Sequence, residues 1–560
     1  SGGDGAGHWP SLLQRLVVTA LALAAGAWLG LGGLQTPAPV GPKEAVFSAV
    51  RAAEAARRTL GESPRPIGSP ASLLAVERLA DALRQRGMEV QLDEATVKTG
   101  GREVRLRNVV ARRTGTKPGP AVLLMAHHDS AATSPGACDD GMGVAIVLEA
   151  AGALSSGPWK GRDVILLLTD GEESGLLGAR HFAANHPWRD QVGSVLNVDN
   201  RGNRGPCLLY ETSGADARLM QAAAPFMGPV VANSLFAEIA RHLPNTTDLA
   251  VFRELGVPGL NFALIDGHDH YHSPTDTWQN ADLSSLQHEG EMVLAALYAL
   301  AMQPEEGTRS DGRAVFLDIG GSVLAWWPSR AGMTGAALCT AAVMGAAYLG
   351  CRHRRVRNTQ VPIAALATVA QAVAAMLACA GLLWIAGALG LYGMDAAKAA
   401  QPDAPVLAQY RSAFWPSIGV PLLGISMAAG LVAAWFASRP ILRRLDGMAT
   451  IWGAWIVLGT FITCMAVLLP GASAPLLPIL LVTSILIAIG SFLLEARAPM
   501  PALLALAATA FMAGLTLAPI EALSWIGIGL SMPAYAGLRA AIYAAMLLPA
   551  LAAADPRRAA

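Results

Sequence analysis

The stretch DVILLLTDGEESGLLGARHFAAN, residues 163–185, joins an uninterrupted apolar run to an amphipathic segment through two adjacent glutamates. The apolar run has the length of a strand that is buried on both faces, and the segment after it has helical spacing. Glu172 and Glu173 therefore lie at a strand-to-helix turn, where neighbouring side chains point in different directions. We predict that these two carboxylates have different tasks.

The same alternation recurs on both sides of this stretch. AVLLMA (121–126) precedes GVAIVLEAAGAL (143–154), which has helical spacing, and GSVLNVDN (193–200) is first apolar and then acidic. Continuous apolar runs that alternate with helices are typical of a parallel sheet covered on both faces. We therefore predict an α/β fold with a mostly parallel mixed sheet flanked by helices. Ligands of such sheets bind beyond the carboxyl ends of the strands.

Composition divides the chain into parts of different character. Its 560 residues are 53% hydrophobic and 15% charged, whereas charged residues make up about 25% of an ordinary soluble domain. Only residues 41–314 have the composition of a soluble domain. The formal net charge of zero gives no indication of nucleic-acid binding. Six cysteines without a CxxC motif do not form a disulfide framework, although a single Cys138–Cys207 bridge stays open.

Long apolar segments predict a membrane protein. Residues 16–34 are long enough to cross a bilayer, and we interpret them as a retained anchor rather than a cleaved signal peptide. An all-α bundle follows over 331–553, and a different division of 501–553 would raise the total from eight spans to nine. The seven spans predicted in the bundle are about 331–351, 362–390, 415–437, 449–470, 475–494, 501–520 and 535–553.

Basic residues predict the orientation. CRHRRVR (351–357), SRPILRRLD (438–446) and DPRR (555–558) follow alternate spans, so all three lie on one side, which the positive-inside rule assigns to the cytoplasm. Both termini, residues 1–15 and 554–560, are then cytoplasmic. The 41–314 domain is expected on the periplasmic, extracellular or luminal side.

Charged side chains are scarce in the predicted spans. Arg539 is the clear charge, Gln371 is polar, and Glu521 lies near a span end. A transporter whose soluble domain only binds would require charges that line a path. This reading is therefore disfavoured.

Metal-ligating residues follow the predicted strands. The candidates in these positions are His127, His128, Asp129, Asp139, Asp140, Glu172, Glu173 and Asp199. A later segment, DGHDHYHSPTD (266–276), adds His268, His270 and His272. Imidazole and carboxylate ligands without thiolate suit zinc or another first-row divalent ion in a hydrolytic site. Two ions that share one carboxylate need about five protein ligands, which leaves one glutamate of the pair as ligand and the other as base.

Each of these residues also has a structural interpretation. An aspartate after a strand is often a helix cap, and adjacent glutamates can complement a helix N-terminus. Such coincidences at four successive strand ends are improbable together. Packing or surface positions are expected for His128, His181, His186, His242 and His288.

Five blocks in one order resemble a known family. AHHDS (126–130), SPGACDDGMGVA (134–145), TDGEESGLLGA (169–179), NVDNRGNRGP (197–206) and YHSPTDT (271–277) resemble the M28 zinc aminopeptidase family. The resemblance covers about residues 60–300, and the membrane spans make the chain similar to the endoplasmic-reticulum metallopeptidase (Fxna-like) branch and its bacterial relatives. It implies a fold of the zinc aminopeptidase or phosphorylase/hydrolase type.

The resemblance implies five ligands for two zinc ions, or other first-row divalent ions. Asp139 would bridge the ions, and Glu173 and His272 would complete the set. His127 and Asp199 are expected to bind opposite ions.

The resemblance also implies roles outside the ligand set. Glu172 would be the general base for a water between the metals, and Asp129 would orient His127. Tyr271 is a candidate to hydrogen-bond the developing oxyanion. A cis peptide bond is expected between Asp139 and Asp140. Cys138 stands where other small or polar residues are more usual, and we expect it to pack.

The sequence therefore favours a membrane-anchored two-metal exopeptidase, most simply an aminopeptidase acting on peptides. A single-zinc enzyme of the glutaminyl-cyclase type and a non-catalytic binding or transport protein are the alternatives. QPDAPVLAQYRSAFWP (401–416), the longest loop expected on the non-cytoplasmic side, is a candidate floor beneath the active site. Oligomeric state is not indicated.

Overall fold

The chain forms two compact units in a computed structural model. One unit is Gly32–Ser329, and the other combines the N-terminal segment with the residues from Arg330 onward. The first unit extends beyond the expected 41–314 domain at both ends. The described residues are 11–43, 47–214, 216–241, 246–303, 312–353, 356–391, 419–493, 499–527 and 533–552.

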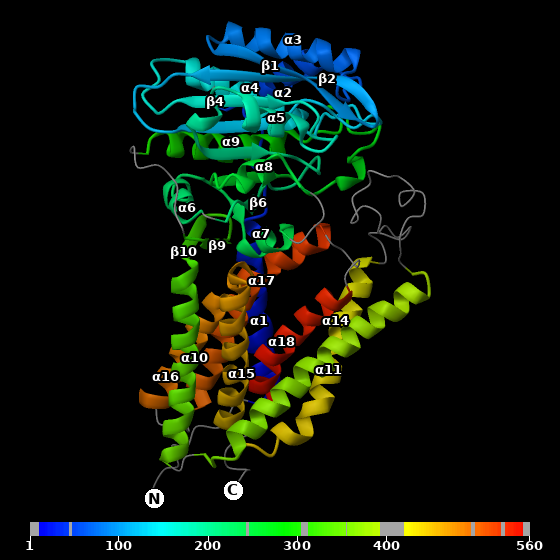
Figure 1. Ribbon diagram of the computed structural model, residues 1–560. Coiled ribbons are helices and arrows are strands. Elements are labelled where there is room, and N and C mark those ends of the chain that lie inside the picture. Colours follow the sequence, from blue (N-terminus) through cyan, green and yellow to red (C-terminus); the bar gives the residue numbers. More distant parts are fainter. Residues whose placement is uncertain are drawn as a thin grey trace, which may run out of the picture. The chain divides into compact units, whose positions relative to one another are not determined.

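The first unit is built on an eight-stranded sheet with the order β1-β2-β4-β3-β5-β8-β6-β7 (Figure 1). Its strands are β1 (Glu89–Thr99), β2 (Arg102–Arg113), β3 (Ala121–His127), β4 (Val164–Thr169), β5 (Val192–Val198), β6 (Leu208–Thr212), β7 (Val231–Ala232) and β8 (Gly259–Ala263). The runs predicted as strands at 121–126, 163–170 and 193–200 are β3, β4 and β5, which confirms those predictions.

The sheet is mixed, with a parallel centre. Strands β4, β3, β5 and β8 pair in parallel, whereas β1–β2, β2–β4 and β8–β6 pair antiparallel. "Mostly parallel" therefore describes the centre better than the edges. Gly100 and Gly101, both with positive φ, form the tight turn between β1 and β2, a conformation that glycine adopts without steric cost.

Helices cover both faces of this sheet. Alternate residues of β3 enter two separate clusters: Val122 and Leu124 contact the side of α2, α4 and α9, and Leu123 and Met125 contact the side of α5 and α8. A strand buried on both faces needs apolar residues at every position, and this explains the continuous run. The helices of this unit are α2 (Ala49–Leu60), α3 (Pro70–Gln85), α4 (Gly141–Ser155), α5 (Leu177–Asn185), α6 (Ala217–Ala223), α7 (Ser234–Ala240), α8 (Leu249–Glu254) and α9 (Leu283–Ala301).

A β-hairpin beyond residue 314 belongs to the same unit. Strands β9 (Ala314–Ile319) and β10 (Val323–Pro328) pair antiparallel. Phe316 is 1% exposed in the main core, and its backbone N–H donates to Ser234 Oγ at 2.7 Å. The hairpin therefore completes the unit rather than linking it to the next segment.

The secondary structure of the second unit, over its described residues, is helical. By length and composition, seven of its described helices could cross a membrane, and α16 is a shorter apolar helix. The expectation of eight spans matches these eight helices but remains a prediction, as does the orientation. Residues 401–416, 1–10 and 553–560 lie outside the described residues. The helices are α1 (Leu12–Gly32), α10 (Ser329–Arg352), α11 (Gln360–Ala388), α14 (Gly419–Leu442), α15 (Gly447–Leu468), α16 (Leu477–Leu493), α17 (Pro499–Gly527) and α18 (Pro533–Ala552).

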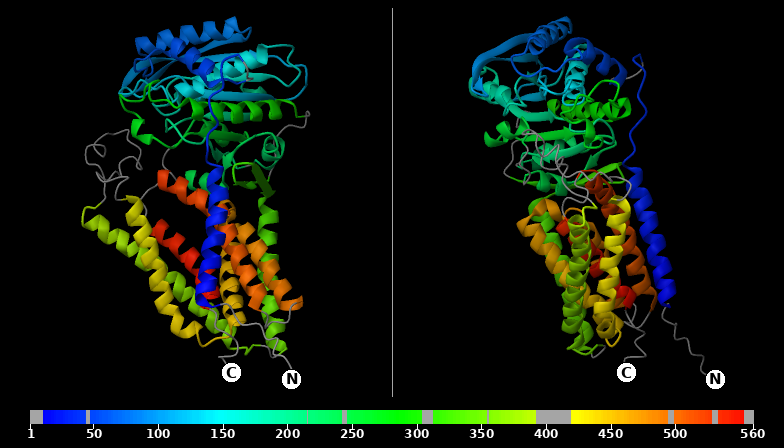
Figure 2. Two further views of the ribbon diagram at one scale, coloured as in Figure 1. Left: turned by 180° about the vertical axis from the view of Figure 1, so that it is seen from behind. Right: turned by 90° about the vertical axis from the view of Figure 1, so that its right-hand side faces the viewer.

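Small residues and a polar pair hold the helices of this unit together. Helix α1 lies along α17 (Figure 2), where a Cβ atom on Gly26 would stand 2.0 Å from the carbonyl oxygen of Phe511. Close approach through glycine is typical of helix pairs in membranes. Arg539 of α18 forms an ion pair with Glu521 of α17, and its guanidinium lies 4.7 Å from the ring centroid of Tyr535. The clearest charge of the predicted spans is therefore neutralised by a neighbouring helix.

Candidate metal centre

Adjacent parallel strands bring the predicted site residues to one edge of the sheet. His127 is the last residue of β3 and pairs in register with Thr169, the last residue of β4. Strand β5 lies on the other side of β3 and ends one residue before Asp199. Because the carboxyl ends of these strands meet, the loops that follow them converge there.

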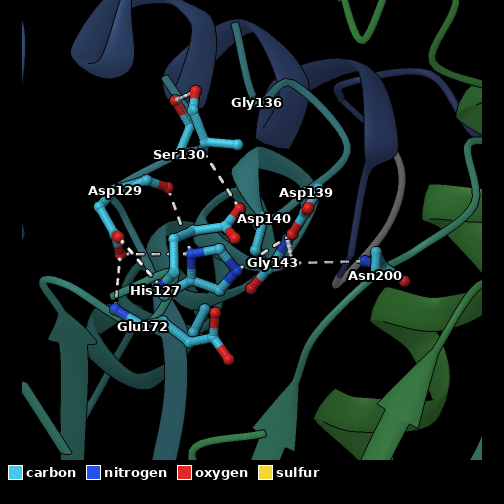
Figure 3. Close-up of polar contacts among 12 residues, drawn as sticks. His127, Asp129, Ser130, Gly136, Asp139, Asp140, Gly143, Glu172 and Asn200 are labelled. Carbon is cyan, nitrogen blue, oxygen red and sulfur yellow. Dashed lines mark hydrogen bonds and ion pairs between the residues drawn. The ribbon is translucent and has the colours of Figure 1, made fainter. Parts of the chain in front are cut away.

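Five side chains form two groups that share one carboxylate. His127, Asp139 and Asp199 offer ligand atoms within 4.8 Å of one another, and so do Asp139, Glu173 and His272. His127 Nε2 lies 3.1 Å from Asp139 Oδ1 (Figure 3), and His272 Nε2 lies 3.2 Å from Asp139 Oδ2. All five predicted ligands are thus together, with Asp139 between the two groups.

This grouping corrects one expectation. His127 and Asp199 belong to the same group, so they would bind the same ion rather than opposite ones. The reason is that β3 and β5 are hydrogen-bonded neighbours, which places the residues at their ends side by side. Glu173 and His272 form the other side, where their side chains approach to 2.9 Å.

The donor set fits zinc. Two ligand atoms on a tetrahedral zinc, each ~2.0–2.2 Å from the ion, stand about 3.3 Å apart, close to the separations from Asp139 to the two histidines. The buried Nε2 of His272 has no hydrogen-bond partner despite the carboxylate oxygens around it. An atom aimed between two carboxylates without a hydrogen bond is placed as a metal ligand would be.

Asp129 contacts both His127 of the first ligand group and the turn that carries Glu172 and Glu173. Its carboxylate lies 3.4 Å from His127 Nδ1 and accepts a hydrogen bond from the backbone N–H of Glu172 at 3.1 Å (Figure 3). It also accepts one from the backbone N–H of Glu173 at 3.3 Å. Asp129 is fully buried. One carboxylate therefore orients the imidazole and fixes the backbone that carries the glutamate pair, as histidine ligands generally require.

The two glutamates are chemically different. Burial, followed by the charge of Asp199, raises the pKa of Glu172 well above its ordinary value. Burial and Asp139 raise the pKa of Glu173 to about 7, while His272 opposes that rise. Glu173 belongs to a ligand group and Glu172 does not. The side-by-side carboxylates are thus divided between two positions, as their sequence context predicts.

Buried polar residues hold the loop that carries Asp139. The guanidinium of Arg65, 1% exposed, donates to the carbonyl oxygens of His128 and Gly136, each at 3.0 Å. The carboxylate of Asp276 accepts from the backbone N–H of Cys138 at 2.8 Å and of Asp139 at 3.2 Å. Burial raises the pKa of the Cys138 thiol well above its ordinary value, so this cysteine packs as an uncharged side chain. All six cysteines are free, which excludes a Cys138–Cys207 bridge.

A second buried network lies behind Asp140 and was not expected from the sequence. The side chain of Asn200 accepts from Leu264 N–H at 2.6 Å and donates to Glu289 at 3.0 Å and to Asp140 at 3.5 Å. Burial raises the pKa of Glu289 to about 8. The peptide bond between Asp139 and Asp140 is cis, which confirms that expectation. Glu289 lies mid-helix in α9 and belongs to no motif, so no sequence signal pointed to it.

The other histidines among the described residues lie outside both ligand groups. His128 donates from Nε2 to Arg107 O at 3.0 Å, and burial lowers its pKa to about 4. His288 bonds to the backbone of Cys207 and Pro229. His186 stacks on Phe182, His181 faces Asp93, and His270 bonds to Thr275. For His128, His181, His186 and His288 these contacts agree with the expected packing or surface positions, whereas His270 was a candidate ligand. His242 lies outside the described residues.

Tyr271 stands beside the second ligand group. Its ring stacks on the imidazole of His272, with centroids 3.9 Å apart and an interplanar angle of 17°. His272 has a left-handed backbone with φ of 52°. Side chains of consecutive residues normally diverge, and this conformation brings the two rings together.

Part of the chain matches a known protein family. Residues 108–297 match Peptidase family M28. Endoplasmic reticulum metallopeptidase 1 of Mus musculus is 32% identical over 222 residues, which are 38% of this chain and 24% of that protein. The chain thus matches about a quarter of that curated relative's length.

Two solved structures resemble less than half of the chain. Porphyromonas gingivalis glutaminyl cyclase has 23% identity, a TM-score of 0.38, and coverage of 45% of this chain and 98% of its own. The aminopeptidase from Aneurinibacillus sp. strain AM-1 has 16% identity, a TM-score of 0.39, and coverage of 47% and 96%.

Proposed function

We propose that this chain, which contains a domain of peptidase family M28, is a membrane-anchored zinc metallopeptidase that removes residues from the amino terminus of peptides. The observation that carries this proposal is the pair of ligand groups joined at Asp139. A shared carboxylate is the arrangement of sites that hold two metal ions close together.

His127, Asp139 and Asp199 would hold one zinc ion, and Asp139, Glu173 and His272 would hold the other. When bound, two such ions would polarise the scissile carbonyl and lower the pKa of a water to about 7. Asp129 supports this set by orienting His127 from behind.

Glu172 moves the protons of the reaction. Its backbone is held by Asp129, and its carboxylate lies outside both ligand groups. A carboxylate so placed takes a proton from the attacking water and gives it to the leaving amine.

Tyr271 supplies a hydrogen-bond donor beside the second ligand group. Its ring stacks on His272, and we infer that its hydroxyl lies near that ligand. A donor aimed at the carbonyl oxygen as it becomes negative stabilises the transition state more than the substrate.

The membrane segments place this chemistry at a bilayer. We propose that the basic segments face the cytoplasm and that Gly32–Ser329 lies on the opposite side. A transport role has less support, since the Arg539–Glu521 pair neutralises the clearest charge of the described helices. To test this, a cysteine is introduced at exposed Glu254 or at exposed Arg443, and each variant is treated with a membrane-impermeant thiol reagent. Only the cysteine at position 254 should react from the non-cytoplasmic side.

The decisive experiment uses full-length protein purified in detergent and incubated with a peptide panel, with products identified by mass spectrometry. A peptidase releases single amino acids from the amino terminus. A glutaminyl cyclase instead converts amino-terminal glutamine to pyroglutamate with loss of ammonia. Release from the carboxyl terminus, or cyclisation alone, would overturn the proposal.

A further inference from the structure

Arg201 lies two residues after the ligand Asp199, on the loop that leaves β5. Its backbone N–H donates to Leu264 O at 3.1 Å, and the N–H of Gly202 donates to the same oxygen at 2.8 Å. These paired hydrogen bonds fix the backbone from which the long side chain extends. Arg201 therefore starts from a rigid position next to the candidate metal centre.

The guanidinium of Arg201 reaches the side chain proposed as oxyanion donor. Its Cζ lies 5.9 Å from the centroid of the Tyr271 ring, within the range of a cation–π contact. The Tyr271 ring in turn stacks on His272 at 3.9 Å. Three side chains thus form a series, from the cation through the phenol ring to the ligand.

This series restrains the Tyr271 hydroxyl. An aromatic side chain rotates about two bonds, and contact with His272 alone constrains only part of that freedom. The contact with Arg201 adds a second point of support. Since catalysis depends on accurate placement of the donor, loss of the contact with Arg201 should lower kcat rather than raise KM.

We propose that Arg201 is a positioning residue that acts through the ring of Tyr271 to aim its hydroxyl at the oxygen of the reacting carbonyl. This inference rests on the proposed function. Arginine suits the task because its planar guanidinium stacks on an aromatic ring, which the compact ammonium of lysine does less well.

Another role for Arg201 would be to bind a carboxylate of the substrate. The contact with Tyr271 favours the positioning role, because it directs the cation to a ring rather than leaving it aimed only at solvent. The two roles predict different substrate dependence, so one experiment separates them.

The test is a double-mutant cycle on full-length protein with Arg201→Met, Tyr271→Phe and the combination, assayed on an aminoacyl amide that has no carboxylate and on a dipeptide that has one. We expect Tyr271→Phe to lower kcat by ~10²–10³-fold, the usual cost of one oxyanion donor. Arg201→Met should lower kcat by about tenfold with KM nearly unchanged. In the Tyr271→Phe background, Arg201→Met should change kcat less than about twofold, because the hydroxyl that Arg201 positions is gone. Arg201→Lys should restore part of the loss.

Arg204→Met is the matched control. Arg204 is on the same loop but is exposed and pairs with Asp266 at 3.2 Å, so its replacement should leave kcat unchanged. Zinc content is measured for every variant. Loss of zinc in Arg201→Met, equal losses in both Tyr271 backgrounds, or a KM effect confined to substrates with a free carboxylate would each overturn the positioning role.

Binding of leucine phosphonic acid, measured by calorimetry, supplies a readout that does not need turnover. Its tetrahedral phosphonate resembles the tetrahedral intermediate that forms when water adds to the reacting carbonyl. Arg201→Met should weaken binding only when the Tyr271 hydroxyl is present. Wild-type protein that binds this probe without cleaving peptides would refute the proposed function. The binding constants of the Arg201→Met and Tyr271→Phe variants would still test the role of Arg201.

Discussion

Nε2 of His127 lies 3.1 Å from Oδ1 of Asp139, while the other oxygen of that carboxylate faces His272. One side chain thus serves both ligand groups. We predict that Asp139→Asn lowers zinc content from two ions per chain to less than one, whereas His272→Ala removes mainly one ion. Elemental analysis of protein purified without chelators measures this. If Asp139→Asn retained two ions, Asp139 would not be shared.

The adjacent glutamates provide a matched pair of variants. Glu172→Gln should keep two zinc ions and lower kcat by ~10²–10⁴-fold, the usual contribution of a general base. Glu173→Gln should lose zinc from the group that it forms with His272 and Asp139. Metal analysis and kinetics on both proteins test the assignment together, and a nearly unchanged kcat in Glu172→Gln would exclude Glu172 as the base.

The candidate ligands were identified from the sequence because each follows an apolar run or lies in a block that resembles the family. Glu173 and Asp199 follow apolar strands, and Asp139 lies in the loop after another such strand, just before a helix, so sequence position alone indicated a common edge. The pairing of His127 with Asp199 was not predictable in this way. It depends on strand order, which places β5 next to β3, and the sequence does not specify that order.

The sequence also did not indicate the buried residues that support the loops of the candidate site. Glu289 and Arg65 lie in segments whose local pattern is that of an ordinary helix or loop. Their roles arise from contacts between residues 89 and 71 positions apart, respectively. The antiparallel β1–β2 edge and the β9–β10 hairpin were missed for a related reason, since alternating strands outside the motifs carry no marker of their partner.

Glu289 predicts a specific pH dependence. Its pKa is raised to about 8 in the folded chain, against about 4.3 in an unfolded one. Between these values the folded state binds one more proton than the unfolded state, so this group lowers the free energy of unfolding as pH rises through that window. The destabilisation should be complete once the pH exceeds about 8.

Glu289→Gln isolates this contribution. The amide keeps a polar group beside Asn200 but cannot ionise. We expect the melting temperature of Glu289→Gln to rise relative to wild type between pH 5.5 and 8.5, measured by intrinsic fluorescence. A constant difference across this range would show that Glu289 does not titrate there. Exposed Glu254→Gln serves as the control and should show no such trend.

The Arg539–Glu521 pair predicts non-additive effects on the helical unit. Replacing either residue alone leaves the other charge without its partner among apolar helices, which is costly. Replacing both, with Arg539→Gln and Glu521→Gln, removes that cost. We expect each single variant to melt at a lower temperature than the double variant in detergent. A double variant less stable than both single ones would show that the residues contribute independently.

The last prediction concerns where the chemistry resides. All five ligand candidates, Glu172 and Tyr271 lie within Gly32–Ser329, which has its own core. A fragment of residues 32–329 should therefore fold, bind two zinc ions and cleave small aminoacyl substrates.

A shorter fragment, residues 41–314, should be less stable because it lacks the β9–β10 hairpin. Phe316 would leave the core, and Ser234 would lose the backbone N–H that it accepts at 2.7 Å. Truncating a buried phenylalanine alone costs about 3–5 kcal/mol, a large share of a domain's stability. The comparison requires circular dichroism, zinc analysis and kinetics on both fragments beside full-length protein. A 32–329 fragment that is folded and fully metallated yet inactive, beside an active full-length protein, would show that residues outside this unit help to build the site.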